Sequence, residues 1–504
     1  MAFLQAHILD ALILAPLAAV VALLLIGEGN RVAIRVLSVA TAALTLLISI
    51  WLFFVYDQGS GGFQFVVRHE WVPSLGIAHQ VGADGITVAM VMLTAIVYTA
   101  GTLVSWFVDS RTKDFYILLH ALVAGVFGVF VSLDLFFFYF YYELAVVPMY
   151  LLIGFWGSTN REYATMKLTL YLTAGAVVAL VGLLMVYFSG LSAEPTFDLL
   201  VLREAAAQGG LSSSAQQFLF PILLLGFATI APMWPLHTWS PGGHAAAPAA
   251  ASMMHAGVLM KLGSYAIIRV AMPLLPEGAV VWLPLVAVLC CFNIIYGGYV
   301  AMTQRDMKFV VGYSSSSHMG YVLLGLASLT VMGLDGAVFL MFAHGVMTAL
   351  AFALIGFFYD QTHTRELDDL GGLMQQIPFV GTLFMMTAMA SLGLPGFANF
   401  ASELLVLVGS WERYPIPTIL AIFGLVIGAT YLLRMVKEAF LGPRIERWDG
   451  LRDASTLLER APFLLLLGTL LIFGIYPAPI VRLIETGVVP LIDTLLAAES
   501  ALGH

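Results

Sequence analysis

The stretch LDLFFFYFYYELAVVPMY, residues 133–150, places a single glutamate, Glu143, inside a long apolar and aromatic run. A helix that crosses the hydrocarbon core of a bilayer needs about 20 mostly apolar residues, and this run with its neighbours is long enough. A charged side chain at the bilayer centre costs at least about 2.5–3.5 kcal/mol. The sequence therefore predicts a membrane-spanning helix that keeps a titratable group at depth for a functional reason.

The same pattern returns at Lys261, His318, His344 and Glu403, which also lie inside apolar segments. With a helix rise of about 1.5 Å per residue, Glu143 lies roughly 14 Å into its segment, and Lys261 and the two histidines lie roughly 18–21 Å into theirs. Carboxylates, imidazoles and amines release and rebind protons when their surroundings change. We therefore take these five residues as a candidate proton relay that runs along the membrane near its midplane.

Each of these residues also has an interpretation without transport. Glu143 could be a partner in a structural ion pair, and Lys261 could extend its ammonium to the membrane surface. Glu403 could lie near the membrane edge, and a histidine such as His318 or His344 is often a hydrogen-bonded core residue. One residue alone would leave the choice open, whereas five together favour transport because each buried charge has its own cost.

The composition supports a membrane protein and excludes several other classes. Of 504 residues, 61% are hydrophobic and only 10% are charged, and the net charge of −9 resides mostly in loops. No basic nucleic-acid footprint, Walker motif or dinucleotide fingerprint occurs. Cys290 and Cys291 are adjacent in an apolar run, so neither a structural disulfide nor a metal site is expected there. No Lys or Arg precedes Arg31, so the first apolar run is interpreted as a retained helix and not as a signal peptide.

Hydropathy predicts about fourteen membrane-spanning helices in an all-α integral membrane protein. Their expected ranges are 9–26, 33–55, 84–107, 115–132, 134–156, 166–189, 216–236, 247–272, 279–300, 306–327, 330–358, 378–410, 415–440 and 461–482. The run 115–156 is too long for one helix and is divided at Ser132-Leu133-Asp134, with Asp134 as the expected N-cap. With this count, fifteen of the 21 Lys and Arg fall on one side of the membrane and five on the other, while Lys261 lies inside a span. The positive-inside rule then puts both termini on the periplasmic side of a bacterial inner membrane.

Two spans contain Pro/Gly interruptions at comparable places. One is Ala231-Pro232-Met233-Trp234-Pro235 in the seventh span, and the other is Gly393-Leu394-Pro395-Gly396 in the twelfth. An offset of five spans reverses the topology, so spans 4–8 and 9–13 are expected to form two inverted five-helix repeats. The predicted organisation is three N-terminal helices in 1–110, the first repeat in 111–275, the second in 276–440, and the last span with a C-terminal tail in 441–504.

Three more residues are auxiliary candidates for the relay. Lys167 opens the sixth span at the membrane edge, where a plain basic anchor is the simpler interpretation. His237 flanks the first interruption and could cap or shape that loop, as could His244. His255 lies one and a half helical turns before Lys261.

Several segments together resemble the antiporter-like subunits of respiratory complex I. They are Leu133 to Tyr150, Pro235 to Trp239, Leu259 to Gly263, Ser316 to Gly320, His363 to Leu367 and Gly393 to Gly396, within roughly residues 85–480. Glu403 resembles the M-type branch of this family, whose sister subunits usually carry lysine there. The resemblance implies a non-redox, proton-pumping subunit of an NADH:quinone oxidoreductase. It also implies that flavin and iron–sulfur clusters lie in partner subunits, and that other antiporter-like membrane subunits are neighbours.

One position departs from the family pattern. A lysine usually precedes the seventh-helix interruption as the partner of the fifth-helix glutamate, and Ile230 stands there in this chain. Lys167, His237 or His255 could substitute, and our hypothesis is that His255 and Lys261 take over part of the relay. Three alternatives stay open: a subunit of an Mrp-type cation/proton antiporter, a subunit of a membrane-bound hydrogenase, or a scaffold that no longer conducts.

Overall fold

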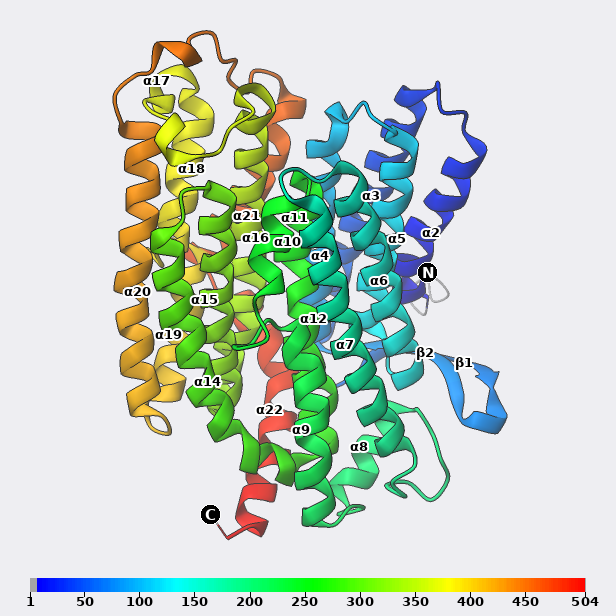
Figure 1. Cartoon of the computed structure of the whole chain (residues 1–504). Helices are drawn as coiled ribbons and strands as arrows, with labels where there is room; N and C mark the ends of the chain where they lie inside the picture. Colours follow the sequence, from blue (N-terminus) through cyan, green and yellow to red (C-terminus); the bar gives the residue numbers. More distant parts are fainter. Residues whose placement is uncertain (1–6, 504) are drawn as a thin grey trace.

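A computed structural model describes residues 7–503. The fold is helical apart from one hairpin (Figure 1). In chain order the main elements are α2 (Ile8–Leu25), α3 (Arg31–Val55), β1 (Gln64–Val72), β2 (Ile77–Ala83), α4 (Gly85–Val104), α5 (Thr112–Val131), α6 (Leu135–Trp156), α7 (Arg161–Tyr187), α8 (Leu199–Ala207), α9 (Ser213–Ile230), α10 (Trp239–Ala246), α11 (Ala249–Met254), the π-helical turn η3 (His255–Leu259), α12 (Met260–Ala266), the π-helical turn η4 (Ile267–Ala271), α13 (Met272–Leu274), α14 (Pro276–Thr303), α15 (Met307–Ala327), α16 (Val331–Thr362), α17 (Leu373–Gln376), α18 (Pro378–Ser391), α19 (Ala398–Trp411), α20 (Pro415–Val436), the π-helical turn η6 (Lys437–Leu441), α21 (Leu457–Ile475) and α22 (Ala478–Ala501).

Twelve helices within residues 7–503 are long and apolar enough to cross a membrane. The continuous helix from α11 to α13 counts as one of them. The serine-rich α15 and the pair α18 and α19 lie at the two other places where the sequence predicts spans. The all-helical, multi-span prediction is therefore confirmed.

The division of 115–156 into two helices is also confirmed. Helix α5 ends at Val131 and α6 begins at Leu135. The Asp134 carboxylate accepts hydrogen bonds from the backbone N–H groups of Phe136, at 2.9 Å, and Phe137, at 3.0 Å. This is the geometry of an N-cap, which satisfies backbone donors that have no partner inside the helix.

Both predicted interruptions are present. Helix α9 ends at Ile230 and α10 starts only at Trp239, while α18 ends at Ser391 and α19 starts at Ala398. In the second interruption Gly393 and Gly396 have φ values of +67° and +103°, which side chains with a Cβ rarely adopt. The backbone there turns without a helical hydrogen-bond ladder, with Leu394 and Pro395 exposed and the flanking residues Ser391 and Phe397 buried.

Two connections contain structure that hydropathy alone does not predict. The segment 57–83, between two predicted spans, contains the antiparallel hairpin of β1 and β2. The last span was predicted to end at residue 482, but α21 already ends at Ile475. Pro477 follows, and a proline cannot continue the hydrogen-bond ladder of the helix before it. The tail after it forms a second long helix, α22, which packs against α4, α14 and α16.

The two most deeply buried spans are α16 and the continuous helix from α11 to α13, whose residues are shielded along their whole apolar length. Outer helices such as α3, α20 and α21 expose most of theirs. In Figure 1 the connection between α2 and α3 lies at the same end as α17 and the α20–α21 connection, while α8 and the C-terminus lie at the other end. The two central spans carry Lys261 and His344, so the fold encloses the candidate relay.

A buried ion pair fixes α4 against the helix that carries Lys261. Arg269 in η4 donates from Nη1 to Asp84 Oδ2 at 2.8 Å and from Nη2 to Asp84 Oδ1 at 2.5 Å. Asp84 is also the N-cap of α4 and accepts from the backbone N–H of Thr87 at 2.9 Å. Both charged side chains are almost completely buried. Because the guanidinium binds both carboxylate oxygens, the pair fixes the relative orientation of the two helices as well as holding them together.

The Arg269→Met variant should be strongly destabilised, because it leaves the Asp84 carboxylate buried without its cation. Loss of one partner of a buried pair costs about 3–5 kcal/mol. Denaturant unfolding of the purified protein in detergent measures this change. The matched control is Arg31→Met, since the Arg31–Asp109 pair is exposed and should contribute at most about 1 kcal/mol. An Arg269→Met variant as stable as this control would contradict the role given to the pair.

Candidate functional site

Lys261 is completely buried, and its ammonium has two polar contacts. The Nζ atom donates to the carbonyl oxygen of Ala256 and lies 2.8 Å from His344 Nδ1. Ala256 belongs to the π-helical turn η3, where the regular i→i−4 ladder is interrupted, and such turns are frequent at functional sites. Among residues 7–503, no Asp or Glu forms an ion pair with Lys261. The arrangement can pass a proton between an amine and an imidazole.

His344 continues the contact across α16 to α15. Its ring centroid lies 5.2 Å from that of His318. On the far side, His318 Nδ1 lies 3.2 Å from Glu403 Oε1, and His318 Nε2 lies 3.3 Å from the Ser391 hydroxyl. The second interruption makes room for the carboxylate, because a Cβ added at Gly393 would lie only 2.5 Å from Glu403 Oε2. Glu403 is 2% exposed, so its carboxylate lies inside the protein.

Two histidines extend the row in the other direction. The ring centroids of His244 in α10 and His255 in η3 are 4.1 Å apart, and both side chains are fully buried. His244 Nε2 lies 3.0 Å from the Ser240 hydroxyl. His255, one π-helical turn before Lys261, has no hydrogen-bond partner at either ring nitrogen within the described chain. Helix α10, which the first interruption creates, is what brings His244 to this position.

We call these residues the central row: His244, His255, Lys261, His344, His318 and Glu403. The row links α10, the η3–α12 segment, α16, α15 and α19, and from Lys261 to Glu403 each member lies next to the following one. Four of the five main sequence candidates lie in it. His244 was interpreted as a loop-shaping residue, and only its position on a short buried helix after the interruption gives it a place here.

Glu143, the fifth main candidate, lies apart from the row. Its side chain is partly exposed on the outer face of α6 and lies beside Tyr139. Between α6 and α12 is a narrow cavity lined by Tyr142, Ile230 and Leu262, together with other apolar residues. The Tyr142 hydroxyl is buried and has no hydrogen-bond partner in the part of the chain that is described. Ile230 therefore leaves an apolar gap where the family lysine would connect Glu143 with Lys261.

Two of the auxiliary candidates form a separate group. Lys167 is half-buried on α7, with Nζ 5.8 Å from the centroid of the Tyr163 ring, and its charge acts on His237. His237 is buried in the first interruption, and its ring packs at 5.6 Å from the ring of Tyr296. Neither residue contacts the central row, whereas His255, the third auxiliary candidate, belongs to it.

A small cavity of about 10 Å³ with a mostly apolar lining lies beside the row, between α15, α16, α18 and α20. Four hydroxyl-bearing residues line it: Ser314, Thr348, Thr387 and Ser391. Ser391 contacts His318, and Ser314 accepts a hydrogen bond from Tyr431 at 2.8 Å. Because Ser314 lies near the start of α15 and Thr387 lies in α18, the cavity extends from the row toward the end of the bundle where α17 lies.

Comparison with known proteins places this geometry in a family. Residues 132–428 match the family described as "NADH:quinone oxidoreductase/Mrp antiporter, TM". The chain is 34% identical to NADH-quinone oxidoreductase subunit M of Rhodobacter capsulatus over 99% of both chains. It is 35% identical to the subunit of the same name from Rickettsia bellii, over 90% of both chains.

Solved structures show the same fold. A chain of respiratory complex I from Thermus thermophilus with bound NADH superposes with a TM-score of 0.88 at 29% identity, over 97% of this chain and 99% of that one. A chain of the Mrp complex from Dietzia superposes at 0.85 with 20% identity, over 99% of both, which shows a shared fold alone. The protein that carries the central row is therefore a member of the NADH:quinone oxidoreductase/Mrp antiporter family, and within it an antiporter-like chain of the subunit M type.

Proposed function

We propose that this chain moves protons across a bacterial inner membrane as one subunit of an NADH:quinone oxidoreductase. The observation that carries the proposal is the row of neighbouring titratable side chains from Lys261 through His344 and His318 to Glu403. These groups lie in the two most buried spans and next to them, where charge without function would only lower stability. Electron transfer would take place in other subunits, so the chain would contribute as a non-redox part of a translocase.

The row can shift charge in discrete steps. The Lys261 ammonium can give its proton to His344, and His318 can pass one to Glu403 across the 3.2 Å contact. Each transfer changes the proton affinity of the next group, because interacting sites titrate as a set and not singly. Orphaned buried atoms mark positions where ordered waters would join the chain: His255 Nδ1, His344 Nε2 and both polar atoms of the Asn399 side chain.

The small cavity beside His318, where hydroxyl groups interrupt an apolar lining, is the candidate route for proton uptake. By the distribution of basic residues the α17 end of the bundle is cytoplasmic, which would put both termini on the periplasmic side. The hydroxyls of Ser314, Thr387 and Ser391 could then hold one water in this cavity, and the cavity would have to widen during turnover to join His318 with the cytoplasm. Spans 4–8 and 9–13 would be the two inverted repeats, each with one interruption next to the relay.

Glu143 has a different place in this proposal. Because it is partly exposed on the outer face of α6, it can interact with a neighbouring membrane subunit instead of with Lys261. Coupling to that neighbour would arise from a change in the charge of a surface carboxylate near the bilayer midplane. Within this chain the signal would then pass from Glu143 over the apolar gap at Ile230 through a change in packing or hydration of the cavity beside Tyr142.

The alternative functions differ in the partner subunits that they require. A subunit of an Mrp-type antiporter or a membrane-bound hydrogenase would use the same row with other partner subunits, and only the purified assembly distinguishes these cases. The curated relatives with 34–38% identity are NADH- or NAD(P)H-quinone oxidoreductase chains, whereas the Mrp chain shares 20%. A non-conducting scaffold would gain nothing from a buried amine without a carboxylate partner.

Replacing the central base tests whether the chain conducts. In the assembled complex, Lys261→Met should slow proton transfer through this subunit on the order of 100-fold, the usual range for loss of a positioned acid–base group. The number of protons pumped per NADH oxidised, measured in proteoliposomes, should fall by this subunit's share. Lys437→Met is the matched control, since Lys437 is exposed at the end of α20 and should pump normally. Unchanged pumping in Lys261→Met would favour the scaffold.

A second variant tests whether His255 replaces the family lysine that is absent at Ile230. His255→Ala should remove most of the pumping that Lys261→Met removes, because it interrupts the row between His244 and Lys261. Ile230→Lys in the His255→Ala background should recover part of the loss, since an ammonium there would bridge the gap toward Glu143. The matched control is His363→Ala, an exposed histidine after α16. Normal proton stoichiometry in His255→Ala would refute the substitution by His255.

A further inference from the structure

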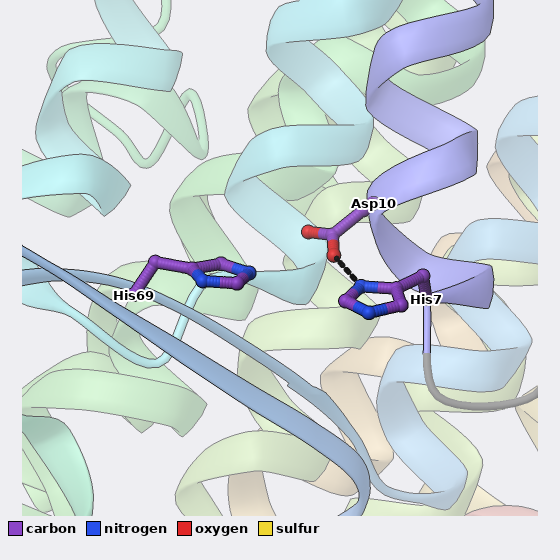
Figure 2. Close-up of side chains that lie close together, drawn as sticks. All are labelled: His7, Asp10 and His69. Carbon is purple, nitrogen blue, oxygen red and sulfur yellow. Dashed lines mark hydrogen bonds and ion pairs between the residues drawn. The ribbon is translucent and has the colours of Figure 1, made fainter. Parts of the chain in front are cut away.

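A group of histidine and aspartate side chains lies outside the central row, where the hairpin meets the first helix. His7 and Asp10 come from the start of α2, and His69 comes from β1 (Figure 2). One ligand atom from each of the three lies within 4.8 Å of the other two. Figure 2 shows His69 projecting from the hairpin toward Asp10, which is hydrogen-bonded to His7. None of these residues takes part in the proposed relay.

The hairpin register directs a second histidine to the same place. His69 in β1 pairs with His79 in β2, and directly opposed residues of an antiparallel pair project from the same face. His79 Nδ1 lies 3.9 Å from Asp10 Oδ1, and its other nitrogen, Nε2, is 2.9 Å from the Tyr141 hydroxyl. A metal-bound histidine commonly uses its second nitrogen in this way, which fixes the orientation of the ring.

The carboxylate at the centre is incompletely paired. Asp10 Oδ2 lies 2.9 Å from His7 Nδ1, but Oδ1 is buried and has no hydrogen-bond partner within residues 7–503. A buried polar atom is normally satisfied by protein, water or an ion. The Oδ1 atom faces the hairpin side of the group, because its nearest basic atom there belongs to His79.

We propose that His7, Asp10, His69 and His79 bind one divalent transition-metal cation, with Zn²⁺ as the best fit. Three imidazoles and one carboxylate are the ligand types that Zn²⁺ accepts in tetrahedral sites. Zn–N distances of 2.0–2.1 Å place tetrahedral ligand atoms about 3.3 Å apart. The ligand atoms of His7, Asp10 and His69 therefore need to approach by about 1.5 Å or less, which rotation of the exposed His69 side chain can supply, and the His79 ring has to move toward these three to complete the set.

The cation would bind the β1–β2 hairpin to the first turn of α2, and through His79 to Tyr141 on α6. Tyr141 lies two residues before Glu143, so the site would stabilise the outer end of the helix that carries this carboxylate. The sequence predicts no metal site here because His7 and Asp10 lie about 60 residues before His69 and His79, and the four residues form no short motif. The site does not depend on the proposed proton transport.

Metal content of the purified complex tests the proposal. After exposure to Zn²⁺ and removal of free ion, elemental mass spectrometry should find one more zinc per complex in wild type than in His69→Gln or Asp10→Asn. His363→Gln is the matched control and should retain the wild-type number, since His363 is an exposed histidine that is none of the four proposed ligands. Equal zinc in wild type and His69→Gln overturns the proposal. His69 is exposed, so its replacement leaves the core intact.

A second measurement tests the site without determining the zinc content of the complex. Hydrogen exchange of the β1 and β2 amides should slow at least tenfold on addition of Zn²⁺ to wild type, because the cation joins the hairpin to α2. The same amides should show no change in His69→Gln. Identical exchange with and without Zn²⁺ in wild type would contradict the site even if an extra zinc were found.

Discussion

The structure depends on a lysine that is held inside the membrane-spanning bundle without a carboxylate partner. Within residues 7–503, the Lys261 ammonium has two polar contacts, a carbonyl freed by a π-helical turn and the imidazole of His344. An unpaired ammonium in a low-dielectric interior is expensive, and a site of this kind is stable only if its proton can be shared or released. The deep burial of α16 and of the helix from α11 to α13 creates this condition.

The remaining architecture follows from the need to hold polar groups away from lipid. The two interrupted helices supply backbone and space at depth: the first creates α10 and positions His244, and the second leaves a glycine where Glu403 needs room. The Asp84–Arg269 ion pair, further along the helix that carries Lys261, holds this helix against α4. Outer helices expose apolar faces to lipid or to neighbouring subunits. Function and fold are thus linked through the same few polar contacts.

Much of this could be predicted from the sequence. The length of the apolar segments predicted the spans, the Ser132–Asp134 segment predicted a helix boundary, and the Pro/Gly clusters predicted both interruptions. Each of these signals is local in the sequence. The titratable residues were conspicuous for the same reason. Which of them touch could not be predicted, since that depends on how distant helices pack. His244 gained its position from the fold of the first interruption, and Glu143 was left on the outer face of α6. The hairpin and the group around Asp10 were missed because no local motif encodes them.

The central claim is that Glu403 and the histidine beside it exchange protons during turnover. Isotope-edited infrared difference spectroscopy of the complex, recorded between its resting and turning-over states, measures this directly. We expect a carboxyl C=O band that changes in wild type and disappears in Glu403→Gln, because a protonated carboxyl absorbs apart from a carboxylate. Difference spectra that are the same with and without Glu403 would contradict the account.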